Sequence, residues 1–209
     1  GRYTYMFDQA SNLWSFGHGG DSYLEPLALK CPDFPPNNEL MWVYYESYPG
    51  PINERCISGN GIYDIVVDSE GKPVLFFSDE RDENNIYAYK YQSPGNWDSL
   101  GYVTGYNSSE FAIDDEDDLY AVAADGVQKY LKFNGSEWVD LNYPYDDGSY
   151  VLKFWNDRLY TSNGDGIASF DGTTWYYLEG PDLLMCQISE ICFLSNGDYV
   201  VDGTFRRDG

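Results

Sequence analysis

The chain has 209 residues, of which 35 are Asp or Glu and 12 are Lys or Arg. This length corresponds to one domain or two small ones, and it is sufficient to bury a hydrophobic core. The excess of negative charge repels phosphate backbones, so we expect no nucleic-acid partner, and no apolar run of about eighteen residues is present for membrane insertion.

Short alternating runs of apolar and polar residues begin near the N-terminus and continue along the chain. Residues 1–17 predict two strands, and a degenerate hairpin follows at 24–47. Four clearer hairpins come next, each with an apolar strand, a turn rich in Asp, Asn, Ser and Gly, and a second strand. Helical periodicity is nearly absent, which predicts an all-β protein. The four hairpins span 63–79, 110–125, 150–165 and 190–204.

A second repeated unit lies between these hairpins and ends in Trp. It is clearest in "FNGSEW" at 133–138 and "FDGTTW" at 170–175, where Asn-Gly and Asp-Gly favour a tight turn. We expect each unit to form a turn and the outer strand of a repeat, with the Trp packing between neighbouring repeats. The Trp residues of the later units are spaced by 41 and then 37 residues, and a related stretch lies near the N-terminus: Trp97, Trp138, Trp175 and Trp14.

A repeat of about 40 residues with four short strands is typical of a propeller blade. The sequence therefore predicts one domain over residues 1–209, a five-bladed β-propeller with four strands in each blade. The N-terminal strands at 1–17 are expected to complete the last blade and close the ring, because this pairs the open strand edges. The expected blades span 18–58, 59–105, 106–146, 147–185, and 186–209 joined to 1–17.

At two places the residues resemble the repeats of bacterial two-component-regulator propellers. These are Val67-Asp68-Ser69-Glu70-Gly71 and "GIASFDGTTW" at 166–175, which match the family's Asp-x-x-Gly turn and its Gly-[ILV]-x-x-[FY]-[DN]-Gly-x-x-Trp pattern. The resemblance implies a β-propeller outside the cytoplasm that senses sugars within a larger chain. Two sequons, at Asn107 and Asn134, also fit an extracellular or periplasmic location.

Carboxylates recur where the innermost strand of each expected blade begins. Glu25, Asp64, Glu110 and Glu190 hold this position at the mouth of the expected central channel, and Ser149 holds it in the fourth blade. Closely spaced carboxylates repel one another, so they either bind a cation or have raised pKa values. Oxygen ligands suit Ca²⁺ or Mg²⁺, whereas raised pKa values suit general acid–base catalysis. A solvated rim without a ligand is the third interpretation, and the sequence leaves all three open.

Aromatic residues outside the repeat pattern are candidates for ligand binding. Exposed rings beside acids and amides suit the apolar faces of sugars, and they also serve as anchors for a protein partner. The alternative is that these side chains pack inside the sheets. The candidates are Trp42, Tyr44, Tyr45 and Trp155, with Tyr48, Tyr143 and Tyr145 in Pro-rich connections.

Three smaller features predict local structure. The Asp-rich run at 114–118 occupies the turn of a hairpin, where a solvated turn is expected and a weak surface calcium site is the alternative. Cys31 and Cys56 are candidates for a disulfide, whereas Cys192 lies in an apolar run and is expected to be a buried thiol.

The sequence favours a monomeric, non-enzymatic binding module that recognises a glycan or a protein outside the cytoplasm. A glycoside hydrolase or lyase that uses the carboxylates at the channel mouth is the alternative from another class. A scaffold segment of a larger sensor or adhesion protein is a third. No cofactor is expected, apart from a Ca²⁺ ion if the carboxylates bind one.

Overall fold

The computed structural model describes strands, turns and one connection, and before residue 64 it describes the backbone alone. No helix among the described residues is long and apolar enough to cross a membrane. The described residues are 3–7, 13–18, 26–31, 43–47, 62–79, 82–93, 96–104, 110–124, 127–145, 151–163, 166–178 and 186–205.

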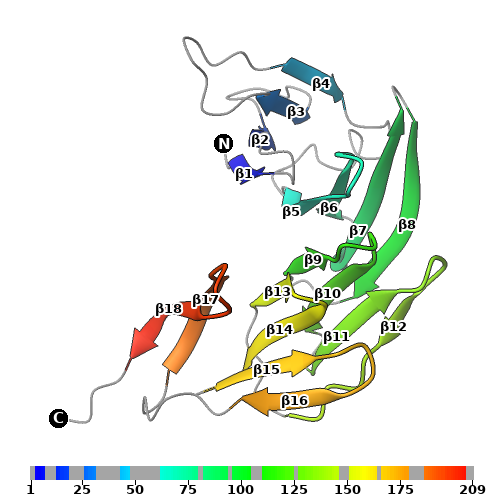
Figure 1. Ribbon diagram of the computed structural model, residues 1–209. Coiled ribbons are helices and arrows are strands. Elements are labelled where there is room, and N and C mark those ends of the chain that lie inside the picture. The colour runs from blue at the N-terminus through cyan, green and yellow to red at the C-terminus, as the bar shows by residue number, and fades with distance from the viewer. Residues whose placement is uncertain are drawn as a thin grey trace. The chain divides into compact units, whose positions relative to one another are not determined.

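The strands form five antiparallel sheets, and in each sheet they lie in chain order (Figure 1). Sheet A contains β1 (Tyr3–Phe7), β2 (Leu13–His18), β3 (Pro26–Cys31) and β4 (Val43–Ser47). Sheet B contains β5 (Ile62–Val67), β6 (Pro73–Asp79), β7 (Asp82–Ser93) and β8 (Asn96–Thr104). Sheet C contains β9 (Phe111–Ile113), β10 (Leu119–Ala124), β11 (Gln128–Phe133) and β12 (Trp138–Asp140). Sheet D contains β13 (Leu152–Trp155), β14 (Arg158–Asn163), β15 (Gly166–Phe170) and β16 (Trp175–Leu178), and sheet E contains β17 (Cys186–Phe193) and β18 (Tyr199–Phe205).

Four-stranded antiparallel sheets of this kind are the structural unit of a propeller blade. The all-β architecture and the repeated four-stranded unit predicted from the sequence are therefore confirmed. The degenerate hairpin at 24–47 is formed by β3 and β4. The four clearer hairpins are formed by β5–β6, β9–β10, β13–β14 and β17–β18.

The prediction for the N-terminal strands is wrong. β2 pairs with β1 on one side and with β3 on the other, so both strands belong to sheet A and not to the sheet of residues 186–209. The blade predicted at 18–58 therefore begins earlier, at β1. The physical reason is that strands joined by a short connection pair at a small cost in loop-closure entropy.

The chain divides into two compact units, which are described separately. One comprises Gly1–Tyr106 with Gly135–Glu137 and carries sheets A and B. The other comprises Asn107–Asn134 with Trp138–Gly209 and carries the strands of sheets C, D and E.

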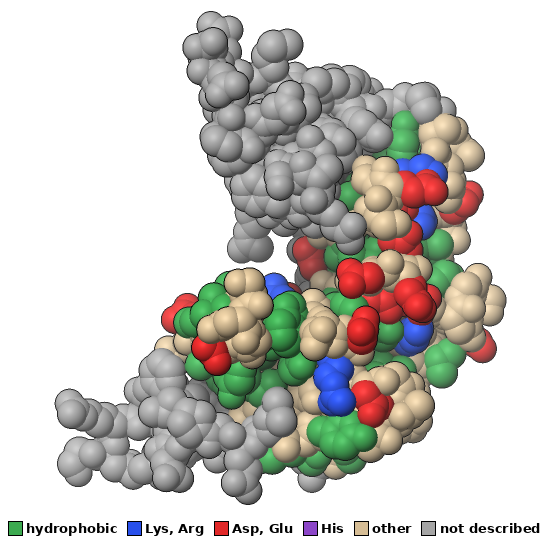
Figure 2. Space-filling model, in the orientation of Figure 1, with side chains coloured by type: hydrophobic (Ala, Val, Ile, Leu, Met, Phe, Trp, Pro, Cys, Tyr) green, Lys and Arg blue, Asp and Glu red, His purple; other side chains and the backbone are tan. Residues whose placement is uncertain are grey.

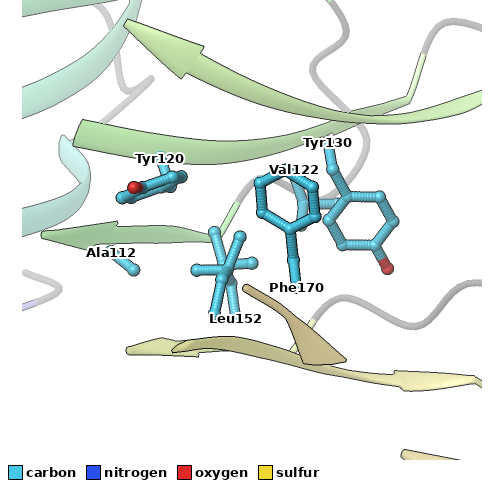
Figure 3. Packing of buried hydrophobic residues seen from close by; sticks show 7 residues of the cluster. Ala112, Tyr120, Val122, Tyr130, Leu152 and Phe170 are labelled. Atoms are coloured by element: carbon cyan, nitrogen blue, oxygen red, sulfur yellow. The ribbon is translucent and has the colours of Figure 1, made fainter. Parts of the chain in front are cut away.

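Sheets C and D pack face to face through a core of buried side chains. Figure 3 shows Tyr120, Val122 and Tyr130 of sheet C lying against Leu152 and Phe170 of sheet D. Alternation along each strand sends every second side chain to this face. The two sheets are thus stacked as neighbouring blades are.

A second core joins sheets D and E. Val151, which directly precedes β13, and Tyr160 of β14 pack with Ile188 and Ile191 of β17. At its margin the ring of Trp155 stacks on that of Phe193, with centroids 4.9 Å apart and planes 6° from parallel. Large aromatic rings thus cover the end of this core.

The aromatic residues that bound each repeated turn are partners on neighbouring strands. Glycine occupies the turn with a positive φ, which is +94° at both Gly135 and Gly172. Trp175 also lies on the core between sheets C and D, so for this residue the predicted packing between repeats is confirmed. The cross-strand pairs, with ring centroids 5.0–5.4 Å apart, are Tyr91–Trp97, Phe133–Trp138 and Phe170–Trp175.

A buried carboxylate holds the Asp-x-x-Gly turn of sheet B. Asp68 is 2% exposed. Its Oδ1 accepts hydrogen bonds from the backbone N–H groups of Glu70 at 3.0 Å and Lys72 at 2.7 Å. Its Oδ2 lies 3.0 Å from Nζ of Lys90 on β7. The carboxylate therefore connects the turn between β5 and β6 to the third strand of the sheet.

The Asp-rich turn of sheet C repeats this arrangement. Oδ1 of Asp114 accepts hydrogen bonds from the N–H groups of Glu116 and Asp118 at 2.9 and 2.8 Å, and its Oδ2 accepts one from the Tyr120 hydroxyl at 3.0 Å. Asp118 forms an ion pair with Lys132 on the third strand, β11. The predicted turn is confirmed, but Asp114 is buried within it because its carboxylate satisfies these donors. On the face shown in Figure 2, acidic side chains lie beside basic ones.

Candidate functional site

Aromatic side chains gather where the connection that follows sheet C passes beside sheet D. Tyr130 lies on β11, Tyr143 and Tyr145 lie on the connection after β12, and Trp175 and Tyr177 lie on β16. We call these five residues the tyrosine cluster. Trp175 and Tyr177 share one face of β16, because side chains alternate along a strand.

Ring contacts hold the connection against the sheets. Tyr143 is central, since its ring centroid lies 4.4 Å from that of Tyr130, 4.8 Å from Trp175 and 5.2 Å from Tyr145. The Tyr145 ring in turn lies 5.7 Å from that of Tyr177. Aromatic pairs of this kind contribute about 0.5–1.5 kcal/mol each beyond the area that they bury. The cluster is thus a preformed surface feature.

The hydroxyl groups of Tyr130 and Tyr143 differ in their partners. The Tyr130 hydroxyl lies 2.7 Å from Oγ1 of Thr161 and accepts a hydrogen bond from Nε2 of Gln128 at 3.3 Å. The Tyr143 hydroxyl is buried and lies near the Tyr130 hydroxyl, without a hydrogen bond of good geometry to another described group. Because this hydroxyl is enclosed, Tyr143 contributes to the packing of the cluster rather than to its exposed surface.

Burial raises the pKa of the inner phenols. It raises the pKa of Tyr130 to about 12. The pKa of Tyr143 lies well above its ordinary value, first because the residue is buried and then because the hydroxyls of Tyr130, Tyr145 and Tyr177 lie near it. Both phenols stay protonated at neutral pH. The cluster therefore offers neutral hydroxyls and ring faces, and its inner phenols are unsuited to act as general bases at neutral pH.

Alkaline pH is expected to weaken the fold through Tyr120 and Tyr130. Their pKa values in the folded protein are about 12, whereas an exposed tyrosine titrates near pH 10. The stabilisation by neutral phenols is complete below about pH 10 and is lost as the pH rises toward 12, at about 2–3 kcal/mol per group. Urea unfolding at about pH 8, 10 and 11 measures this loss. The free energy of unfolding of the Tyr130→Phe variant should fall less over this pH range than that of the unsubstituted protein. An equal fall in both proteins would contradict the contribution assigned to Tyr130.

The tyrosine cluster reaches the surface at β16. Tyr177 is 38% exposed, and its ring covers Gly166 so closely that any side chain at residue 166 would displace it. Tyr176, on the other face of β16, is 44% exposed, and the Arg158 guanidinium lies 5.3 Å from its ring centroid. Such a cation over an aromatic face is attracted by the ring quadrupole. Both faces of this edge strand thus present a tyrosine to solvent.

The role of the predicted aromatic residues in ligand binding stays a prediction. Trp42 lies outside the described residues, and Tyr44 and Tyr45 lie on β4, where the backbone alone is described. Trp155 contributes to the core between sheets D and E, and its role in ligand binding stays a prediction. Of the residues in Pro-rich connections, the structure brings Tyr143 and Tyr145 together.

The metal site predicted at the four carboxylates stays a prediction, because they do not all lie within one described unit. Glu25 lies outside the described residues and precedes β3, which is the third strand of its sheet and not the first as predicted. The Asp64 carboxylate accepts a hydrogen bond from the next backbone N–H, and Glu110 directly precedes β9. Glu190 is exposed and lies 3.0 Å from Nζ of Lys153. No group of three or more Asp, Glu, His or Cys suitable for a metal occurs among the described residues.

Cys192 is exposed with a free thiol, so the prediction of a buried thiol is wrong. The neighbouring Ile191 points into the core with sheet D, and alternation sends Cys192 to the opposite face of β17. The apolar run alone did not specify which face was covered. Cys56 lies outside the described residues, and its predicted bond to Cys31 stays a prediction.

Comparisons with known proteins support the fold. No protein-family model matches the sequence, and no curated protein matches it. The chain is similar to the solved structure of virginiamycin B lyase from Staphylococcus aureus, with a TM-score of 0.59 and 11% identity over 94% of this chain and 61% of the lyase. It is also similar to puromycin hydrolase, with a TM-score of 0.53 and 10% identity over 96% of this chain and 33% of the hydrolase.

These similarities bear on architecture alone. At identities of 10–11% they show a fold of the β-propeller type. The chain spans about three fifths of the lyase and about a third of the hydrolase.

Proposed function

We propose that the chain is a binding module of the β-propeller type, and that it recognises a glycan or protein ligand on the tyrosine cluster. The observation that carries this proposal is the preformed group of rings around Tyr143, whose ring centroid lies 4.4–5.2 Å from those of three other members of the cluster. Beside it, Tyr177 presents a ring face to solvent. Rings with a polar tip favour ligands that have both apolar faces and hydroxyl or amide groups.

The test is a screen of neutral oligosaccharides by calorimetry, followed by substitution within the cluster. Tyr177→Ala and Tyr145→Ala should each weaken binding about 10- to 30-fold, as expected for an aromatic anchor. Tyr102→Ala is the matched control, because Tyr102 is 52% exposed and lies on β8, in the other compact unit. Equal binding by all three variants would contradict the proposal. A protein ligand becomes the favoured class if no saccharide binds.

The alternative function is a glycoside hydrolase or lyase that uses Glu110 and Glu190. Glu190 is exposed and ion-paired with Lys153, which is typical of a surface pair rather than of a proton donor held in an apolar site. A Glu110→Gln, Glu190→Gln variant that loses turnover of an oligosaccharide would nonetheless establish this alternative. A Ca²⁺ ion at the predicted carboxylates is tested by melting in EDTA and in about 1 mM Ca²⁺, since a ligand bound to the folded state raises the melting temperature.

We further propose that residues 1–209 form one domain of five blade-like repeats, monomeric and located outside the cytoplasm. The spacing of the repeated Trp residues and the two sequons support this proposal. Sedimentation velocity tests the monomeric state, and fractionation of the source cells tests the location.

A further inference from the structure

Sheet E can be aligned with sheets B and C through its turn. The three turns share two backbone hydrogen bonds, one from the first residue to the carbonyl of the fifth and one from the fourth residue back to the first. Positions on the flanking strands can therefore be compared directly. The aligned turns are 68–72, 114–118 and 194–198.

Side chains at equivalent positions are buried in sheets B and C and exposed in sheet E. Val74, Tyr120 and Val200 each lie on a second strand, six residues after the start of the turn. They are 0%, 5% and 55% exposed, respectively. Their partners on the first strand follow the same pattern: Val66 and Ala112 are buried, and Cys192 is exposed.

In sheets B and C, the third strand has a lysine opposite the second-strand position compared above. Lys90 of β7 pairs with Val74, and Lys132 of β11 pairs with Tyr120. Each ammonium group extends to an acid of the turn, Asp68 in sheet B and Asp118 in sheet C. Nζ of Lys132 also lies 5.3 Å from the Tyr120 ring centroid. The aliphatic stem thus lies over the second strand, which in sheet C is also covered by sheet D, and the charge is neutralised at the turn.

Among the described residues, sheet E has the strand edge and the acid but no third strand. Among the described strands, β18 pairs with β17 alone. Asp198 occupies the turn position of Asp118 and is exposed, with its Oδ2 accepting a hydrogen bond from Nδ2 of Asn196 at 2.8 Å. An open strand edge is a template for pairing with another chain.

We propose that the edge of β18 receives an antiparallel strand from a partner polypeptide. The partner strand has β-branched or aromatic residues at alternate positions. It carries Lys or Arg opposite Val200, and this cation forms an ion pair with Asp198. This is recognition by strand addition, in which backbone hydrogen bonds give affinity and side-chain positions give specificity. The inference concerns a different surface from the tyrosine cluster and does not depend on the ligand proposed there.

The chain itself provides the probe for a test. A synthetic peptide of residues 126–140, "GVQKYLKFNGSEWVD", contains the third and fourth strands of sheet C. Its binding to the full chain is measured by fluorescence anisotropy of a labelled peptide. The control peptide carries Tyr130→Pro and Leu131→Pro, which removes two successive N–H groups and so removes whichever one faces β18. We expect the control to bind at least tenfold more weakly.

A charge exchange locates the site. Asp198→Lys in the full chain should weaken binding of the peptide about fivefold, as expected for one exposed ion pair. A peptide with Lys132→Glu should recover that loss on the variant and bind less well to the unsubstituted chain. Far-UV circular dichroism and the melting temperature verify that the variant is folded. The proposal is overturned if no binding occurs at about 1 mM peptide, if both peptides bind equally, or if the charge exchange has no effect.

Discussion

Replacement of Asp68 by Ala is expected to lower the free energy of unfolding by about 3–5 kcal/mol. The carboxylate is almost fully buried and accepts two backbone hydrogen bonds, and it neutralises Lys90. Ala leaves both N–H groups and the ammonium group without this partner. The loss therefore exceeds the value of a single hydrogen bond, because the remaining groups stay desolvated.

Urea unfolding monitored by tryptophan fluorescence measures this loss. Glu70→Ala is the matched control, since the Glu70 side chain is 65% exposed in the same turn and its ion pair with Lys72 lies at the surface. We expect less than about 1 kcal/mol for the control. If the two variants lost the same amount, the Asp68 carboxylate would not hold the turn as described.

Leu159→Ala is expected to cost about 3 kcal/mol. The side chain is 1% exposed and lies in the core between sheets C and D, so its truncation leaves a cavity bounded by both sheets. The loss should appear as a shift in the urea midpoint with an unchanged slope. Val139→Ala in the same compact unit is the control, because Val139 is 42% exposed. A loss below 1 kcal/mol at Leu159 would contradict a shared, tightly packed interface between the two sheets.

Local features of the fold could be predicted from the sequence. Asn-Gly and Asp-Gly in the repeated motifs specify tight turns, and the residues that bound them, such as Phe170 and Trp175, are partners on adjacent strands. The alternating hairpins were also predictable, because one covered face imposes a period of two along a strand. These patterns depend on residues close together in the sequence.

Features that depend on distant residues could not be predicted in the same way. The spacing of Trp14 from the later repeats placed the N-terminal strands in the last blade, whereas β2 pairs with β3 next to it. The Asp-rich turn indicated solvation. However, Asp114 is buried and accepts a hydrogen bond from the Tyr120 hydroxyl on the following strand. Tyr143 and Tyr145 were identified as aromatic candidates. Their positions against Trp175 and Tyr177 of β16 were not, because periodicity does not specify which sheet a connection contacts.

The chain order of the strands has a consequence for how such a protein changes over time. No backbone ladder among the described strands joins one sheet to another. Sheets C, D and E are joined through side-chain packing and the hydrogen bond from the Ser162 hydroxyl to the Ile188 carbonyl. Gain or loss of a whole repeat of about 40 residues therefore leaves every remaining strand register intact. After such a change, only the two sheet faces at the new junction have to pack against each other. The fold therefore accommodates duplication or deletion of a single repeat. The stacking of Trp155 on Phe193 is a contact specific to one pair of neighbouring sheets, as expected after the copies diverged.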